Sequence, residues 1–149
     1  MDMKSTFESM VEDHGHWMLL RKAVLNKPCS CVGREGTILE TCGLCNGSGH
    51  AYVDHLVRAR RTKMIDSVQM TTDLGLVATP RWHFYLPANT QPTHKDWIIE
   101  IELSPTDQQP IYPIKAETYY NVTDVESMRE LSGVLAFWDV QTEKSNWNV

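Results

Sequence analysis

The chain has 149 residues, of which 42% are hydrophobic and 22% are charged, and its formal net charge is −5. These values fit one compact domain with a core of its own. Glycine and proline together make up only 15 of the 149 residues, which argues against a disordered chain. No segment approaches the roughly 20 consecutive apolar residues that a membrane span needs. The first residues lack the apolar run of a signal peptide, so we expect a protein that is made and kept in the cytoplasm.

The charges are distributed unevenly along the chain. Residues 76–149 contain five basic and ten acidic side chains, whereas residues 21–63 contain eight basic and three acidic ones. This bipolar distribution differs from that of a uniformly basic protein that binds nucleic acid over its whole surface.

The chain begins with a predicted short helix. Ser5 and Glu8 have the spacing of a capping box at a helix start, and the apolar residues that follow recur at helical spacing. Gly15 is a typical helix stop. A strand is predicted directly after it, over residues 16–24.

Alternating apolar and polar residues, together with aromatic and β-branched content, predict further strands. These strands cover residues 52–60, 65–70, 81–86, 96–103 and 134–140, with a proline-containing edge strand at 111–114. A second short helix is predicted from Thr123, which forms a capping box with Glu126, to Gly133. The polar tail over residues 142–149 is predicted to be loose.

The predicted elements define the fold class. About six or seven short strands and two small helices occur without the regular alternation of strand and helix that marks a parallel sheet. We therefore predict a mainly β fold for residues 1–149, as a single small antiparallel β-barrel that is SH3-like or sandwich-like. Its additions would be the N-terminal helix, the short helix in the C-terminal half and one inserted loop.

All four cysteines lie in one short stretch, which we predict to be a zinc-binding insert over residues 28–49. The ligands would be two close pairs, Cys29 with Cys31 and Cys42 with Cys45. Two pairs on opposite arms of a loop can supply the four tetrahedral thiolates that zinc prefers. Four thiolates leave no position for water, so the zinc would be structural. The alternatives are two disulfides, free thiols or an iron–sulfur site.

The second cysteine pair belongs to a recognisable pattern. Residues 42–49, Cys-Gly-Leu-Cys-Asn-Gly-Ser-Gly, fit Cys-x-x-Cys-x-Gly-x-Gly, which resembles a knuckle of the zinc domain of J-type chaperones. The four-fold repetition and the His-Pro-Asp tripeptide of that family are absent. The resemblance implies a shared way of folding around zinc and no chaperone function.

No residue pattern indicates catalysis, so we expect that the chain is not an enzyme. The six histidines stand at no motif spacing to a serine, cysteine or carboxylate, and we interpret them as solvated or core side chains. One basic cluster has two interpretations, namely contacts to DNA or a neighbouring subunit, or a solvated strand end with salt bridges inside the chain. This cluster consists of Arg58, Arg60, Arg61 and Lys63.

The layout of the chain resembles that of the head-completion or stopper proteins, which join the portal and adaptor rings of tailed bacteriophages to the tail. The resemblance rests on the N-terminal helix that runs into residues 15–22, on the cysteine hairpin between the first strands and on the aromatic segments that follow. Those segments are Arg81–Pro87, Asp96–Glu100, Tyr119–Glu126 and Phe137-Trp138. The likeness spans most of residues 7–143.

This resemblance implies a structural virion protein of the phage neck, assembled in the bacterial host cytoplasm. It would form a homo-oligomeric ring between the portal or adaptor protein and the tail terminator or tail proteins. Packaged double-stranded DNA would lie in the channel, retained by a loop of each subunit. Residues 66–79 and 88–95 are the candidate loops, and the first is favoured by its length. The alternative is a zinc-ribbon binding module that recognises nucleic acid or a partner protein.

Overall fold

The structure is a computed structural model that describes residues 2–72 and 75–148, with the side chains of residues 2–62 and 80–148. Over these residues the chain forms one α-helix, one short 3-10 helix and six strands. They are α1 (Met3–His14), β1 (His16–Pro28), β2 (His50–Thr72), β3 (Gly75–Pro87), η1 (Ala88–Thr90), β4 (Trp97–Ile101), β5 (Ala116–Arg129) and β6 (Leu135–Lys144). The prediction of a mainly β fold is confirmed.

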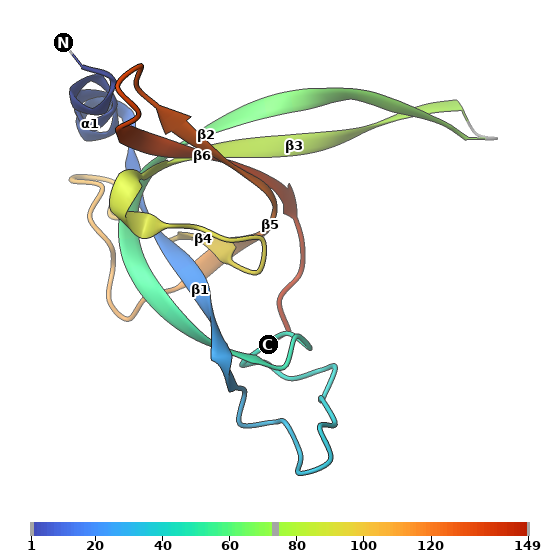
Figure 1. Cartoon of the computed structure of the whole chain (residues 1–149). Helices are drawn as coiled ribbons and strands as arrows, with labels where there is room; N and C mark the ends of the chain where they lie inside the picture. Colours follow the sequence, from blue (N-terminus) through green and yellow to red (C-terminus); the bar gives the residue numbers. More distant parts are fainter. Residues whose placement is uncertain (1, 73–74, 149) are drawn as a thin grey trace.

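The strands form one antiparallel sheet that closes on itself. They pair in the order β1-β2-β3-β6-β5-β4, and β4 pairs again with β1, which closes the sheet into a barrel (Figure 1). Because alternate residues of a strand point to opposite faces, every strand directs some side chains inward. The resulting core consists of Met18, Leu20, Ala59, Phe84, Leu86, Ile98, Tyr120, Val122 and Val140.

β2 and β3 continue beyond the barrel as a two-stranded arm. β1 pairs with β2 only as far as Ala59, and β6 pairs with β3 only from Trp82. Past these points the described parts of β2 and β3 pair with each other (Figure 1). The strand predicted over residues 65–70 is therefore a continuation of β2 and not a separate element. The favoured candidate loop, residues 66–79, contains paired strand at both ends, and its side chains lie outside the described residues.

Two predicted elements in the C-terminal half are wrong. The helix expected between Thr123 and Gly133 is replaced by β5, which runs to Arg129 between β4 and β6. Pairing along two neighbouring strands outweighs the local capping signal, because propensity yields to tertiary context. The edge strand expected at 111–114 is also absent from the described structure, where only an isolated bridge joins Leu103 to Pro110.

Helix α1 packs on the outer face of β6. The ring of Phe7 stacks on that of Phe137, with 4.7 Å between the ring centroids. The N-cap is Asp2, whose carboxylate accepts a hydrogen bond from Ser5 N, so the prediction that Ser5 caps the helix is wrong. Gly15 ends the helix as predicted, for a different reason. Its backbone is extended, and a Cβ there would lie 2.4 Å from the carbonyl oxygen of Val11.

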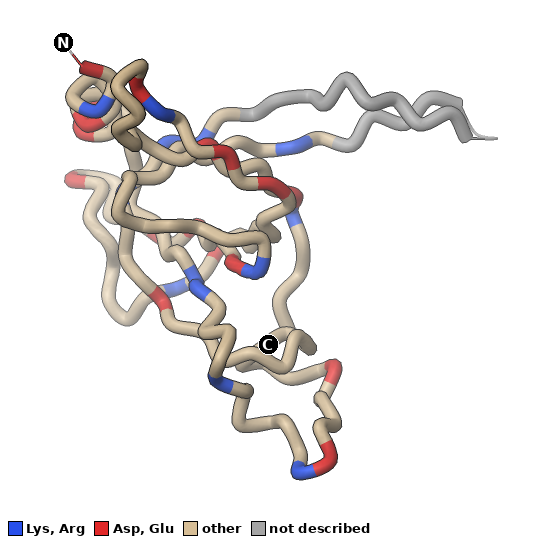
Figure 2. The backbone as a smooth tube through the Cα atoms, in the orientation of Figure 1, with Lys and Arg blue, Asp and Glu red and all other residues tan. Residues whose placement is uncertain are grey.

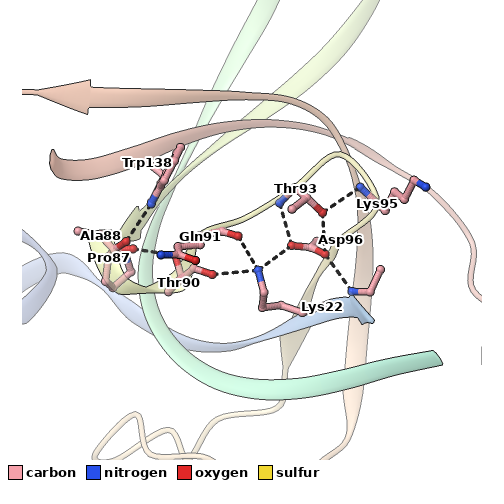
Figure 3. Close-up of polar contacts among 10 residues, drawn as sticks. Lys22, Pro87, Ala88, Thr90, Gln91, Thr93, Lys95, Asp96 and Trp138 are labelled. Carbon is pink, nitrogen blue, oxygen red and sulfur yellow. Dashed lines mark hydrogen bonds and ion pairs between the residues drawn. The ribbon is translucent and has the colours of Figure 1, made fainter. Parts of the chain in front are cut away.

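The connection between β3 and β4 is fixed to the barrel at two points (Figure 3). Lys22 Nζ donates to the carbonyl oxygens of Thr90 and Gln91 and to the buried carboxylate of Asp96. On the other side, Trp138 Nε1 donates to the carbonyl oxygen of Ala88 at 3.0 Å. Residues 88–95, the second candidate loop of the sequence analysis, are therefore held against the barrel.

Candidate metal centre

The cysteine loop closes the end of a β-hairpin. β1 pairs with the first part of β2, from His16 opposite Ala59 to Val24 opposite Ala51, and after an irregularity the last pair joins Pro28 to His50. At the base of the loop, Cys29 N donates to the carbonyl oxygen of Gly49 at 2.9 Å. The cysteines therefore lie at the tip of the hairpin between the first two strands, as the sequence predicts, and below the barrel in the view of Figure 1.

The four cysteine sulfurs lie together in a geometry that could hold a metal ion. All four Sγ atoms are within 4.8 Å of one another. Cys29 and Cys42 are 3.9 Å apart, Cys31 and Cys45 are 3.5 Å apart, and no disulfide joins them. Around a tetrahedral metal with sulfur at about 2.3 Å, neighbouring sulfurs would be about 3.8 Å apart. The side chains present therefore fit a four-thiolate site.

The turn around Cys42 and Cys45 is built by backbone hydrogen bonds. Asn46 N donates to the carbonyl oxygen of Cys42 at 2.9 Å, and Leu44 N approaches the Cys42 sulfur at 3.4 Å. Gly47 and Gly49 have φ of +83° and +79°. Glycine suits these two positions, because other side chains rarely adopt such angles.

The thiols differ in how readily they lose a proton. The Leu44 amide that donates to Cys42 lowers the pKa of this thiol to about 7. Burial raises the pKa of the Cys31 thiol to about 12. Metal binding requires thiolates, so a bound cation would supply the charge that keeps all four ionised.

The C-terminal segment, for which the polar sequence predicts a loose tail, packs against this loop. Trp147 is only 7% exposed, and its Nε1 donates to the carbonyl oxygen of Gly43 at 2.7 Å. Asn46 binds the same segment, since its side-chain amide contacts the backbone of Asn146 and Asn148. The prediction of a loose tail is therefore wrong for these residues. The only local signal was a large aromatic residue within a polar stretch.

The basic cluster is divided between the two faces of β2. Arg58 donates to the carbonyl oxygen of Glu12 at 3.1 Å. Arg61 donates to Glu100 at 2.5 Å and to the Tyr120 hydroxyl at 3.2 Å. Strand alternation places Arg60 on the same face as Arg58 and opposite Arg61. The side chain of Lys63, the fourth member, lies outside the described residues.

One histidine has a carboxylate partner that sequence spacing did not reveal. His83 Nδ1 lies 2.8 Å from Asp139 Oδ1, between β3 and β6, and His83 is buried. The two residues are 56 positions apart in the chain. Only the pairing of β3 with β6 brings them together.

The fold and the four-cysteine site define a β-barrel protein with a candidate metal-binding loop. No protein-family model matches the chain, and no curated protein matches it. In the part of the chain that the structure describes, no helix is long and apolar enough to cross a membrane.

Proposed function

We propose that the chain is a structural, non-enzymatic protein of the neck of a tailed bacteriophage. It would be the head-completion or stopper subunit, forming a ring between the portal or adaptor and the tail and retaining packaged DNA. The observation that supports this proposal is a closed barrel with two projections outside its core, the β2–β3 arm and the loop 29–49 (Figure 1). A subunit that contacts several neighbours in a ring needs such separate contact surfaces.

The closed strand order favours an SH3-like barrel over a sandwich of two open sheets. Of the two candidate loops, residues 88–95 are held by Lys22 and Trp138, which disfavours a moving part there. The β2–β3 arm is therefore the segment that would reach into the channel.

The metal of the cysteine loop would be zinc, with a structural role. Four thiolates favour zinc over harder cations and leave no open coordination position for a catalytic water. The cysteines form a small cluster of their own with Val32 and Tyr52, separate from the barrel core. A metal would supply the stability that so small a cluster lacks.

The loop also presents apolar side chains to the outside. Ile38, Leu39 and Leu44 are 43%, 56% and 67% exposed. Exposed apolar residues gathered on one projection are typical of a protein contact. In the neck, the neighbouring adaptor or tail protein would cover them.

The test is the presence of the chain in purified particles of the phage that encodes it. Mass spectrometry should find the chain in particles, and negative-stain imaging should show rings when the adaptor protein is supplied. A Leu39→Asp/Leu44→Asp variant should join the particles less efficiently, whereas the exposed Ser30→Ala change in the same loop should have no effect. Absence of the chain from purified particles would refute the proposal.

The same exposed apolar residues favour one second candidate, a zinc-ribbon module that binds a partner protein. Such a module would be monomeric and would form no ring with an adaptor. A module for nucleic acid would instead bind DNA or RNA with an affinity that falls steeply with salt concentration.

A further inference from the structure

An aromatic surface beside the cysteine loop holds the side chain of Trp147. The ring of Trp97 meets it edge-on at 5.0 Å and that of Tyr52 at 5.5 Å, while Tyr119 stacks at 6.0 Å. The Arg21 guanidinium lies 4.5 Å from the centre of the Trp147 ring. Three strands and one cation thus enclose a single indole, in the way that binding pockets hold an aromatic anchor.

The cysteine loop contacts the main chain on both sides of this indole. Asn46 Nδ2 donates to the carbonyl oxygen of Asn146 at 3.2 Å, and Asn46 Oδ1 accepts from Asn148 N at 2.8 Å. One side-chain amide therefore pairs with the residue before and the residue after Trp147. The side chain of Asn148 adds a bond to the carbonyl oxygen of Glu40 at 2.8 Å. Paired main-chain bonds around one buried anchor are the usual means of recognising an extended peptide.

We infer that the cysteine loop and the aromatic surface of β1, β2, β4 and β5 form a peptide-binding groove. Its ligand is an extended segment centred on a tryptophan, and residues 145–148 of this chain occupy it. This function is distinct from the proposed role in the phage neck and does not depend on it.

The proposed groove would depend on a metal bound to the cysteine loop. Gly43, whose carbonyl oxygen accepts the indole hydrogen bond, stands between Cys42 and Cys45, and Asn46 directly follows Cys45. Both groups are positioned by the turn around Cys42 and Cys45, which a metal bound to the four cysteines would hold in place. When the metal is removed, the loop loses this turn, and the groove loses its contacts to the indole and to the main chain.

The groove can be tested with a peptide added to the full-length chain. The Trp147→Ala variant, prepared with zinc, empties the indole pocket and leaves the barrel core intact, and its own tail, held only by the contacts of Asn146 and Asn148, is what the added peptide must displace. A blocked, fluorescent peptide with the sequence of residues 144–148 should bind it saturably, with one peptide per chain by anisotropy. A peptide with alanine in place of the tryptophan should bind at least about tenfold more weakly. The wild-type chain, whose groove is filled, should also bind the peptide at least about tenfold more weakly.

Two changes to the protein should remove peptide binding. Adding Asn46→Ala to the variant removes both main-chain contacts, and a strong chelator removes the metal. Each should weaken binding by at least about tenfold while the β signal in circular dichroism persists. Equal peptide affinity with and without metal would overturn the inference, as would no binding by a folded, zinc-loaded Trp147→Ala variant.

A measurement on the wild-type chain covers the case in which Trp147→Ala does not fold. The indole N–H of Trp147 should exchange slowly with solvent in the zinc-loaded protein, and at least about tenfold faster after chelation. An indole that stays equally protected without metal would contradict the proposed groove.

Discussion

Two aspartates that pair with basic side chains differ in their contact with water. Asp96 is fully buried and accepts hydrogen bonds from Lys22, from Ala23 N and from the backbone and hydroxyl of Thr93 (Figure 3). Asp54 pairs with Arg21, and its side chain is 37% exposed. The two ion pairs should therefore contribute very differently to the free energy of unfolding.

We expect Asp96→Ala to lower the free energy of unfolding by about 3 to 5 kcal/mol, because buried donors lose their acceptor. Asp54→Ala should cost about 1 kcal/mol or less, as exposed pairs do. Urea unfolding followed by fluorescence measures both losses. Equal losses would mean that Asp96 does not anchor the connection between β3 and β4.

Tyr120 lies fully buried in the barrel, where its hydroxyl donates to Glu100. Burial, reinforced by this bond, raises the pKa of Tyr120 from 10.0 to about 12. The folded state thus holds the phenolic proton more tightly than the unfolded state does. The resulting stabilisation is complete below pH 10 and is lost as the pH rises from 10 to about 12.

The free energy of unfolding should therefore fall across that pH range, and Tyr120→Phe should make the fall shallower. At neutral pH the same change should cost about 1 kcal/mol for the lost hydrogen bond. Denaturant titrations at a series of pH values measure both effects. The matched control is Tyr112→Phe, since Tyr112 is 72% exposed. In this control the free energy of unfolding should fall with pH as it does in the wild type. If the free energy of unfolding of Tyr120→Phe fell with pH as steeply as that of the wild type, Tyr120 would not be the group responsible.

At the scale of elements, the sequence predicts those parts of the fold whose signal is local. Strands predicted over 52–60, 81–86 and 134–140 lie largely within β2, β3 and β6, because alternation of side chains is a property of a few consecutive residues. The cysteine loop is predictable for the same reason, since ligand spacing is short. The identity of the metal depends on what the cell supplies, and remains part of the proposal.

The failed predictions depend on partners that are distant in sequence. The segment after Thr123 carries helix signals, but its pairing with β4 and β6 is decided by the whole barrel. Trp147 makes its hydrogen bond to Gly43, which is 104 positions away. No local pattern contains that information, because a polar segment with one aromatic residue is equally compatible with a free tail.

Substitution of one ligand tests the cysteine loop as an element. Cys42→Ser removes a buried sulfur that lies 3.9 Å from Cys29 Sγ. We expect the variant to lose bound zinc and the ordered loop, while the barrel keeps its cooperative unfolding. Metal analysis of the purified chain measures the bound zinc, and near-ultraviolet circular dichroism measures the loss of ordered structure. Ser30→Ala, in the same loop and exposed, should bind zinc like the wild type.

Retention of stoichiometric zinc in Cys42→Ser would show that the four cysteines are not the ligand set. Loss of the barrel signal in the same variant would show that the loop and the barrel fold as a single unit.

At the scale of the whole molecule, the uneven distribution of charge along the sequence is also seen among the strands. Acidic residues occur along β5 and β6, whereas the first half of β2 carries arginines (Figure 2). In the proposed ring, basic residues of β2 on one copy, such as Arg60, could face acidic residues of β5 or β6 on the next. Such contacts would weaken as salt screens them.

For the proposed ring, we therefore expect association of the copies to be sensitive to salt. Raising NaCl from about 50 mM to about 500 mM should weaken association by about tenfold or more. Analytical ultracentrifugation over a concentration series measures the change. Rings of unchanged stability at high salt would mean that apolar contacts, and not charge complementarity, hold the subunits together.

β2 joins the two projections of the molecule through one strand. It starts at the base of the cysteine loop, forms part of the barrel wall and ends in the arm (Figure 1). Its hydrogen bonds to β1 and β3 lie across its direction. Tension between loop and arm therefore loads these bonds in shear, all at once, and does not peel them apart singly. A force applied to one projection is therefore transmitted along β2, through the barrel, to the other projection.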